Sequence, residues 1–550
     1  MIELVLQKIE NTPITISRWV SGFIGILFIR FLFESLSSPT RSGLMPIDSY
    51  TLIHYGLFWT TLVLGIIYIV GFCIKNYARA AKMALFGLPI IWIAPILDIV
   101  ISRGAGFTQS YILDTGSKLG YDFVTFFGPN LTWGATYGVR IEMSIVLLGI
   151  GWYIWHETRK KSSVILGIIS AYILGFIVGS WPGILYTLSH ASGATSAMND
   201  VFNYFGKIIF QSTLSHNTLY EGLSSVSTSR FFEIGFAKLS SQILFIFSCL
   251  FSGLLFWNIN KEKFLVVTRN MRAERIGSYL LLLFSGAGFA YVNNLNLHIV
   301  WTDLVGMFCL ILSWIGLWMY AVHTNDIEDV GIDAISNTER PLVKKEMSAN
   351  DMRETGYLWL AVALIGSWCA GFYPFFMSLV YVFTSHIYST PPLRLRQFPM
   401  VSSFLIGVAS LATILAGFFF ISGSKQAQAF PMFLAIGIVI MVTLAINVKD
   451  MKDIAGDTAN GILTVPILFG KSGPRVVAIC FALSFLLVPV FLSFYLLYII
   501  AIPAGIIGYK LVTRKPYREE PIFILRFAFF ALIAIVYLGI YWIGHIYNMI

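Results

Sequence analysis

The chain has 550 residues, of which 57% are hydrophobic and only 12% are charged. This composition excludes a soluble protein, because apolar runs of membrane-spanning length recur along the whole sequence. The formal net charge of +9 does not indicate a nucleic-acid-binding protein, because the lysines and arginines lie in short loops between the apolar runs. We therefore expect an all-α polytopic membrane protein whose partner is the lipid bilayer and not a nucleic acid.

The apolar segments predict about fifteen transmembrane helices. In chain order they are 16–36, 51–74, 83–102, 141–156, 163–189, 237–258, 276–293, 299–322, 357–373, 375–388, 402–421, 429–447, 476–490, 491–509 and 523–546. The runs 357–388 and 476–509 are each divided in two, because one helix of that length would be about 50 Å long while the hydrocarbon core is roughly 30 Å thick. Pro374 and Pro489 lie near their middles and favour a break there.

The charges of the loops predict the orientation of these helices. Lysine and arginine clusters follow every second predicted helix, whereas the other loops carry little charge or are long. By the positive-inside rule the N-terminus then lies in the cytoplasm and the C-terminus outside, in a multi-pass protein of the cell membrane. The longest basic interruption, residues 259–275, is expected to be a cytoplasmic linker. It would join an N-terminal six-helix transmembrane domain of unknown role, residues 1–258, to a nine-helix domain, residues 276–550.

The N-terminal half contains acidic residues in predicted helices and two long outward loops. Asp98 and Glu142 fall at the outer ends of predicted helices, so we expect both carboxylates to be near the surface and solvated. The long outward loop 190–236 is expected to hold amphipathic helices that lie along the membrane interface. Neither this loop nor the loop 103–140 contains a cluster of residues with an assignable chemistry.

Two acidic stretches share the spacing D-x-x-D-x-x-x-D. The first acidic tract (residues 325–333) contains Asp326, Asp329 and Asp333, and the second acidic tract (residues 449–457) contains Asp450, Asp453 and Asp457. On a helix these offsets lie on one face, so each tract predicts a column of three carboxylates. Such a column repels itself unless a cation is bound, and Mg²⁺ binds through a few carboxylates together with substrate phosphates. One tract alone could equally be a solvated acidic loop, but two matched tracts, each following a predicted spanning helix, indicate a site for Mg²⁺-bound diphosphate on the cytoplasmic face.

Four motifs in the second half of the chain occur in the order found in a known family. They are the first acidic tract with Asn325, Arg340-Pro-Leu, Tyr388-Ser-Thr-Pro-Pro-Leu-Arg394-Leu-Arg396, and Asp450…Asp453…Gly456-Asp457…Gly461-Ile-Leu-Thr464-Val-Pro466…Gly470. With these motifs, the chain from about Ile276 to its C-terminus resembles the UbiA superfamily of intramembrane prenyltransferases, which have nine transmembrane helices. Lys345 stands where members commonly have glycine, and Arg396 where lysine is usual. The first of these departures could alter the loop that closes over the site, and with it the choice of acceptor.

The resemblance implies a function and a set of site residues. It implies Mg²⁺-dependent transfer of an isoprenyl group from a polyprenyl diphosphate to a lipid, a quinone-type compound or another hydrophobic or membrane-associated acceptor, with release of pyrophosphate. The implied metal ligands are Asn325, Asp326, Asp329, Asp333, Asp450, Asp453 and Asp457, and the six aspartates together with Tyr388 are the implied catalytic residues. The implied diphosphate-binding residues are Asn325, Arg340, Lys344, Arg394, Arg396 and Lys449.

Two other functions remain as alternatives. The first is transfer of a phosphoribosyl group onto a polyprenyl phosphate; members of that kind have His-Pro where this chain has Ser336-Asn337-Thr338, and they lack a full second tract. The second is a transporter without enzymatic activity whose acidic residues form a cation site, although transporters place such sites near the membrane midplane. The sequence does not identify the acceptor, the length of the donor chain, the oligomeric state or the role of the N-terminal domain.

Overall fold

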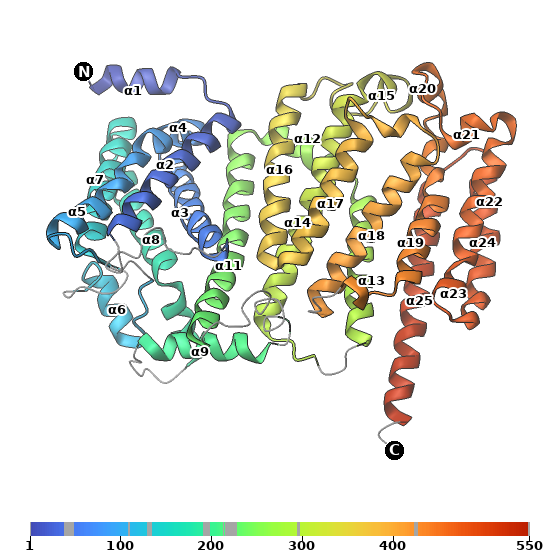
Figure 1. Ribbon diagram of the computed structural model, residues 1–550. Helices are drawn as coiled ribbons and strands as arrows, with labels where there is room; N and C mark the ends of the chain where they lie inside the picture. The colour runs from blue at the N-terminus through green and yellow to red at the C-terminus, as the bar shows by residue number, and fades with distance from the viewer. Residues whose placement is uncertain are drawn as a thin grey trace. The chain divides into compact units, whose positions relative to one another are not determined.

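The computed structural model describes residues 2–37, 49–107, 111–128, 135–190, 198–212, 214, 228–293, 297–422 and 427–547. These residues form helices joined by turns and loops (Figure 1). Twelve helices of this described part are long and apolar enough to cross a membrane, so the chain is an all-α, multi-pass membrane protein. It divides into two compact units. The N-terminal unit comprises Met1–Gln211 and Leu223–Phe264, and the C-terminal unit comprises Ser212–Gly222 and Leu265–Ile550.

The N-terminal unit contains six of the twelve candidate spans. Its described helices are α1 (Ile2–Asn11), α2 (Ile16–Ser37), α3 (Ser49–Ile74), α4 (Tyr77–Gly87), α5 (Ile93–Ile101), α6 (Gly116–Val124), α7 (Tyr137–Thr158), α8 (Lys161–Ser189), α9 (Met198–Gln211) and α11 (Thr228–Ile259), with the 3₁₀ helix η1 (Leu88–Trp92) joining α4 to α5. Helix α9 lies across the ends of longer helices (Figure 1). Its residues Val201, Phe205 and Ile209 are buried one turn apart, which gives the amphipathic helix expected in the loop 190–236.

The expectation for Asp98 and Glu142 was wrong, because both carboxylates are buried. Asp98 accepts hydrogen bonds from the hydroxyl of Thr136 at 2.6 Å and from the backbone N–H of Gly138 at 2.8 Å. Glu142 pairs with the guanidinium of Arg30 at 2.6 Å. Position along a helix therefore did not predict burial, because the partners of these carboxylates come from segments far away in the sequence.

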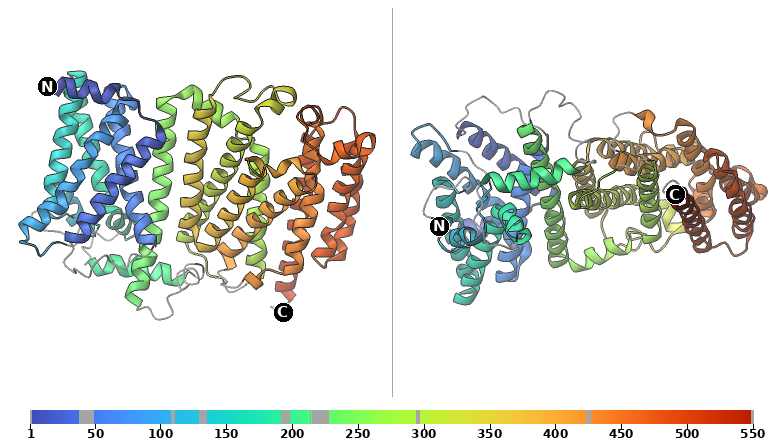
Figure 2. Two further views of the ribbon diagram at one scale, coloured as in Figure 1. Left: turned by 45° about the horizontal axis from the view of Figure 1, so that its top comes forward. Right: turned by 90° about the horizontal axis from the view of Figure 1, so that it is seen from below.

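The C-terminal unit contains the helices that carry both acidic tracts. After α12 (Lys261–Arg269), its helices are α13 (Ala273–Val292), α14 (Trp301–Glu328), α15 (Val330–Ser336), α16 (Ala349–Ala370), α17 (Phe372–Ser389), α18 (Val401–Ser422), α19 (Met432–Ala445), α20 (Ile454–Ala459), α21 (Val465–Leu468), α22 (Gly473–Leu486), α23 (Val488–Phe491), α24 (Tyr498–Thr513) and α25 (Glu520–Tyr547). Short 3₁₀ helices are η2 (Leu395–Gln397), η3 (Ala427–Ala429), η4 (Ile446–Met451), η5 (Gly470–Ser472) and η6 (Tyr495–Leu497). The right-hand view of Figure 2 shows the long helices of this unit almost end on.

Both predicted helix breaks are present. The first falls at Gly371 between α16 and α17, with Pro374 in the first turn of the second helix. The second falls between α22 and α24, where Pro489 lies in the first turn of the short helix α23, at a position that needs no backbone N–H. The helices α16, α17 and α25 correspond to three of the fifteen predicted spans. They are not among the twelve described helices that are long and apolar enough to cross a membrane.

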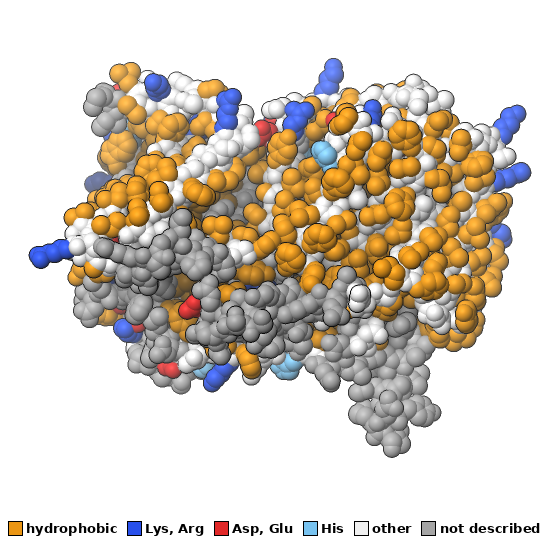
Figure 3. Space-filling model, in the orientation of Figure 1, with side chains coloured by type: hydrophobic (Ala, Val, Ile, Leu, Met, Phe, Trp, Pro, Cys, Tyr) orange, Lys and Arg blue, Asp and Glu red, His pale blue; other side chains and the backbone are white. Residues whose placement is uncertain are grey.

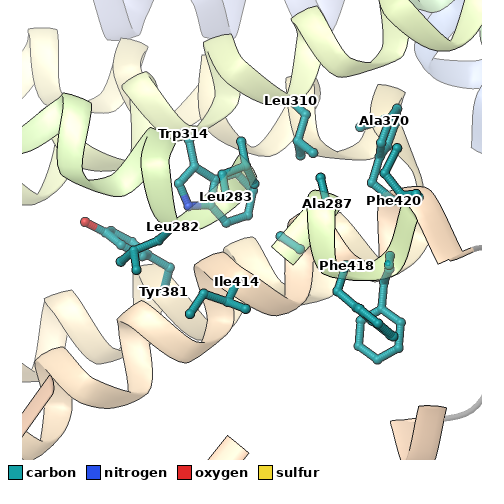
Figure 4. Packing of buried hydrophobic residues seen from close by; sticks show 14 of the residues in the cluster. Leu282, Leu283, Ala287, Leu310, Trp314, Ala370, Tyr381, Ile414, Phe418 and Phe420 are labelled. Atoms are coloured by element: carbon teal, nitrogen blue, oxygen red, sulfur yellow. The ribbon is translucent and has the colours of Figure 1, made fainter. Parts of the chain in front are cut away.

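The core of the C-terminal unit lies between α13, α14, α16, α17 and α18. Figure 4 shows Leu283 and Ala287 of α13 near Trp314 of α14 in this core. The ring N–H of Trp314 donates to the hydroxyl of Thr413 at 3.0 Å, so this buried polar group is satisfied. A Cβ atom at Gly286 would lie 1.9 Å from the carbonyl oxygen of Ile414, which shows that α13 and α18 approach too closely for any other residue there.

Hydrophobic side chains cover the visible face of the C-terminal unit, and lysine and arginine side chains are seen at its edges (Figure 3). An apolar face of this extent is not stable in water, but it suits contact with lipid.

Candidate active site

Each acidic tract spans a break in the helix that carries it. Helix α14 ends at Glu328, and Asp329 is the cap between it and α15. In the second tract the 3₁₀ helix η4 ends at Met451, and Asp453 is the N-cap of α20. The prediction that each column of three carboxylates lies on one continuous helix was therefore wrong. Three like charges on one helical face repel one another, and a break at the middle aspartate relieves this repulsion. Neither Asp329 nor Asp453 makes a side-chain capping hydrogen bond, so both carboxylates remain available to other partners.

The two tracts meet at one end of the C-terminal unit, where α15 and α20 lie side by side (Figures 1 and 2). The side-chain nitrogen of Asn337 donates to Asp333 at 2.9 Å and to Asp453 at 3.0 Å. The hydroxyl of Ser336 accepts a hydrogen bond from the backbone N–H of Gly456 at 3.0 Å. A Cβ at Gly456 would lie 2.3 Å from this hydroxyl, so the close approach of the tracts requires glycine here.

Two arginines from the loop between α17 and α18 contact the carboxylates of the acidic tracts. Arg396 contacts Asp329 of the first tract and lies 3.5 Å from the carboxylate of Asp457 in the second. Arg394 donates to the carbonyl oxygen of Glu328 at 3.0 Å and to the carboxylate of Asp329 at 3.3 Å. Asn325 also donates to Asp329, at 2.7 Å. The carboxylates are thus pre-positioned by cationic and amide donors that reach across both tracts.

Sequence reasoning missed the partners of Asp326. This buried carboxylate accepts hydrogen bonds from Arg272 at 2.5 Å and from Asn270 at 2.9 Å. Both residues lie in the stretch that was assigned to a basic linker. Their loop is short and basic, so its charges were explained by membrane orientation alone. The only signal in the sequence was the density of arginines immediately before α13.

Tyr388 and Lys449 form a second contact between motifs. The ammonium group of Lys449 lies 2.5 Å from the hydroxyl of Tyr388 and 4.7 Å from the centre of its ring. The same ammonium group is 3.8 Å from the carboxylate of Asp450. Tyr388 therefore lies beside the second tract, with its hydroxyl held by a cation.

A cavity of about 210 Å³ opens between these residues. The sequence-predicted residues that line it are Asn325, Asp329, Asp333, Arg340, Tyr388, Arg396, Lys449, Asp450 and Asp453. Farther from the tracts its wall is largely apolar and aromatic, with Tyr279, Trp318 and Tyr381. Sequence reasoning missed Arg275, Lys452, Glu519 and Arg526, which also line it. Among the described lining residues seven are basic and five are acidic, so the wall carries an excess of positive charge.

Two predicted diphosphate ligands are not lining residues of this cavity. Arg394 nevertheless contacts Asp329, as described above. Lys344 instead forms an exposed ion pair with Glu339. The structure therefore brings Arg394 to the acidic tracts and leaves Lys344 in a surface loop.

Three guanidinium groups at the site have an unused donor. The Nε–H groups of Arg272, Arg340 and Arg394 are buried and have no hydrogen-bond partner within the described part of the chain. Arg340 lies 3.9 Å from the carboxylate of Asp333, too far for a hydrogen bond. A buried donor without a partner is costly, so these groups are suited to an additional acceptor with several oxygens.

Burial shifts the protonation equilibria of this site. It raises the pKa of Asp457 to about 6, although the positive charge of Arg396 opposes the shift. Burial also raises the pKa of Asp333, and the negative charge of Asp326 adds to this effect. A cation between the tracts would stabilise the ionised carboxylates and counteract both shifts.

Comparison with known proteins identifies the C-terminal half. Residues 279–543 match the model of the UbiA prenyltransferase family. We call residues 279–543 the UbiA segment, after the family model that they match. Digeranylgeranylglyceryl phosphate synthase of Sulfolobus acidocaldarius is 29% identical to the chain over 209 residues, which are 37% of this chain and 72% of that protein. The protein of the same name from Thermococcus kodakarensis is 30% identical over 165 residues, which are 29% of this chain and 55% of that protein.

The chain is also similar to proteins with other names and to solved structures. Chlorophyll synthase of Oryza sativa is 28% identical over 190 residues, which are 32% of this chain and 48% of that protein. The chain thus spans only about half the length of some of these relatives. A structure of a UbiA homolog from Archaeoglobus fulgidus bound to GPP and Mg²⁺ covers 50% of this chain and 98% of its own, with 17% identity and a TM-score of 0.40.

The oxygen donors of the UbiA segment suit Mg²⁺ in a particular way. No group of three or more histidine, cysteine, aspartate or glutamate side chains able to hold a metal ion is found in the residues that the structure describes. The donors of the two tracts are carboxylate and amide oxygens, several of them held by arginine or asparagine. Mg²⁺ is usually bound by one or two carboxylates plus phosphate oxygens and water. The donors present therefore fit a magnesium ion that binds together with a diphosphate.

Proposed function

We propose that the UbiA segment transfers an isoprenyl group from its diphosphate ester to a hydrophobic or membrane-associated acceptor and releases pyrophosphate. The observation that carries this proposal is the joining of the two acidic tracts by shared donors. Arg396 contacts Asp329 and lies near Asp457, and Asn337 bonds to Asp333 and Asp453. Carboxylates and cations thus converge at the mouth of a cavity whose deeper wall is apolar, which suits a ligand with a charged head and an isoprenoid tail.

The diphosphate is assigned to the cationic side of the cavity. Arg272 and Arg340 each have a buried Nε–H without a partner in the described chain, and Lys449 provides a compact positive charge. Arginine donates along fixed directions to phosphate oxygens, whereas lysine acts as a point charge. The excess of basic residues in the lining then balances part of the ligand's negative charge.

In the proposed reaction the bond between C1 of the isoprenyl group and the diphosphate oxygen breaks. Its electron pair leaves with pyrophosphate, and C1 becomes positively charged as the acceptor atom forms the new bond and loses its proton. The barrier falls chiefly through stabilisation of the charge on the leaving group. Mg²⁺ would supply Lewis-acid stabilisation of the pyrophosphate oxygens. The residues available to hold it are Asn325 and the aspartates of the two tracts, of which one or two carboxylates would coordinate the ion together with the diphosphate. Asn325, Asp329, Asp333, Asp450 and Asp453 line the cavity, whereas Asp326 and Asp457 lie behind its wall.

Aromatic residues are assigned the role of stabilising the positive charge on C1. Tyr279 and Tyr381 line the cavity, and their ring centres are 5.4 Å apart in an edge-on arrangement. Aromatic faces attract a positive charge most strongly where water is excluded. Tyr388 lies nearer the tracts, and its hydroxyl is held by Lys449. The loop charges support a cytoplasmic location for this end of the site.

Pyrophosphate release measures the proposed activity directly. The full-length chain in phospholipid vesicles would be given radiolabelled geranylgeranyl diphosphate and extracted membrane lipids as acceptors, with Mg²⁺ or with EDTA. We expect release that requires Mg²⁺ and falls about a hundredfold or more in Asp329→Asn and in Asp453→Asn. Glu274→Gln, which changes an exposed acid in the first turn of α13, is the control and should retain activity. Consumption of phosphoribosyl diphosphate in place of the prenyl donor would favour the phosphoribosyl alternative.

A further inference from the structure

The N-terminal unit contains a cavity of about 770 Å³. Its lining follows α3 from Thr51 to Val70 and α7 from Val139 to Tyr153. At 1.5 Å per residue, the stretch of α3 is about 28 Å long, which nearly equals the roughly 30 Å of the hydrocarbon core. The cavity is therefore a long slot that follows the spanning direction of the unit.

Most of this slot is apolar, and part of it reaches the surface of the unit. Leu62, Ile67 and Ile150 are among the buried residues of its wall. Ile145 and Trp152 also line it, yet they are 36% and 45% exposed. These two residues of α7 thus form a rim at which an apolar chain can enter from the bilayer.

A buried charge cluster closes the slot near one end. Arg30 is 1% exposed and is 2.6 Å from the carboxylate of Glu142. It also pairs with Glu34, donates to the carbonyl oxygen of Ile91 and lies 5.2 Å from the ring centre of Trp59. The cluster thus brings two carboxyl groups to one guanidinium. Ionisable groups inside a spanning segment mark functional sites by default.

The cluster lies well inside the helix that carries Arg30. Arg30 is seven residues before the end of α2 at Ser37, which places it about 10 Å inside the end of the helix. Beside it, the hydroxyl of Tyr55 lines the slot near the carboxylate of Glu34. This hydroxyl is buried against the carboxylate of Glu34 but has no hydrogen bond of good geometry within the described residues. Leaving it unpaired is costly, so the site is completed by a small ligand group that can share a hydrogen bond.

From these observations we propose that the N-terminal unit binds a long-chain neutral lipid with a small hydrogen-bonding head, of the prenol type. Its chain would fill the slot between α3 and α7, and its hydroxyl would meet Tyr55 and the glutamates. A charged head group would be costly to bury here, because Arg30 and its two carboxylate partners already satisfy one another. This inference does not depend on the transfer reaction proposed for the UbiA segment, because every residue that carries it lies in the N-terminal unit.

Photolabelling tests the location of the site. The full-length chain in phospholipid nanodiscs would be labelled with a photoreactive analogue of geranylgeraniol, and the labelled peptides identified by mass spectrometry. We expect saturable labelling of Ser49–Ile74 and Tyr137–Thr158 that unlabelled geranylgeraniol suppresses and added phospholipid does not. Labelling that spreads over the surface helices of the whole chain, or that phospholipid suppresses equally well, would overturn the proposal.

Glycine variants test whether the slot itself is occupied. Gly179 lines the slot, and a Cβ placed on it meets no atom within 4 Å, so Gly179→Leu fills the slot without a clash at the backbone. We expect this variant to weaken binding of labelled geranylgeraniol about tenfold or more. Gly25 of α2 has equally open surroundings but is not a lining residue, so Gly25→Leu is the matched control and should bind normally. Unchanged binding in Gly179→Leu would contradict the assignment.

The head group is tested with Tyr55→Phe and with two other probes. If the hydroxyl bonds only to the ligand, Tyr55→Phe should weaken geranylgeraniol binding about fivefold while leaving the melting temperature without prenol unchanged or slightly higher. A lower melting temperature with unchanged prenol binding would instead assign the hydroxyl to the fold alone. Geranylgeranoic acid should bind about tenfold more weakly than geranylgeraniol to the unmodified chain. Tighter binding of this acid, or of a long-chain amine, would contradict a neutral head group.

Discussion

Asn337 and Asp453 form a hydrogen bond of 3.0 Å across 116 residues of sequence, and this bond joins the two acidic tracts. The same amide group also holds Asp333. Asn337→Ala would leave two neighbouring carboxylates without their common donor. We expect the KM for the prenyl diphosphate to rise about tenfold and stability to fall by about 1 kcal/mol. Asn293→Ala, an exposed amide at the end of α13, is the control in the same kinetic and thermal measurements.

Gly456 permits the close approach of the second tract to Ser336. A Cβ here would lie 2.3 Å from the hydroxyl of Ser336 and 2.9 Å from the carbonyl oxygen of Ile332. Gly456→Ala should therefore separate the tracts and reduce turnover at least about tenfold. Adding Ser336→Ala removes one of the two clashes and should restore part of the activity, a coupling that a double-mutant cycle measures. Gly331→Ala, where the nearest atom is 3.4 Å away, should remain close to wild type.

Arg340 offers a buried Nε–H that no described residue accepts. Arg340→Lys keeps the positive charge but removes this donor and the planar fork of donors that matches phosphate oxygens. We expect the KM for the diphosphate donor to rise about tenfold with a smaller change in kcat. Arg353→Lys makes the same exchange at an exposed position of α16 and should change neither constant. Equal effects in the two variants would mean that Arg340 does not contact the donor.

Tyr388 combines a ring near the second tract with a hydroxyl held by Lys449 at 2.5 Å. Tyr388→Phe keeps the ring and releases the ammonium group of Lys449. If the tyrosine positions this cation against the leaving group, kcat should fall about tenfold while the KM changes little. Tyr388→Leu also removes the ring and should lower kcat further than Tyr388→Phe does. Single-turnover measurements of pyrophosphate release separate these effects on chemistry from effects on product release.

Bound ligand should stabilise the fold only when metal and diphosphate are present together. The described residues offer no cluster of three carboxylates for a metal alone, whereas the arginines have spare donors for phosphate oxygens. At a hundred times its dissociation constant, a metal–diphosphate pair adds about 2.7 kcal/mol to the free energy of unfolding. Thermal unfolding of the full-length chain with inorganic pyrophosphate, Mg²⁺ or both measures this. An equally large shift with Mg²⁺ alone would contradict joint binding.

Much of the fold and several contacts of the site followed from local patterns in the sequence. Apolar length predicted the spanning helices, and the matched spacing of Asp329 and Asp453 with their neighbours predicted that the tracts act together. Residues inside the four motifs, such as Arg396, could be identified as candidate site residues in the same way. Each of these signals depends on residues close together in the chain.

What the sequence did not reveal depends on contacts between distant segments. The pairing of Arg272 with Asp326 could not be separated from the general basic character of the loop before α13. The burial of Arg30 and Glu142 was missed because position along a spanning segment does not show which neighbour a charged side chain faces. The helix breaks at Asp329 and Asp453 were also missed, because spacing alone cannot distinguish a continuous helix from two helices joined at a cap.

The most direct test of the central claim is whether both tracts bind one metal–diphosphate unit. Electron paramagnetic resonance of the full-length chain with Mn²⁺ and an unreactive thio-analogue of geranylgeranyl diphosphate reports both the bound metal and its contact with phosphorus. We predict a bound Mn²⁺ signal with phosphorus hyperfine coupling that is lost or strongly weakened in Asp329→Asn and also in Asp453→Asn, and that persists in Glu274→Gln. A signal that survives either of the two aspartate substitutions unchanged would contradict the account.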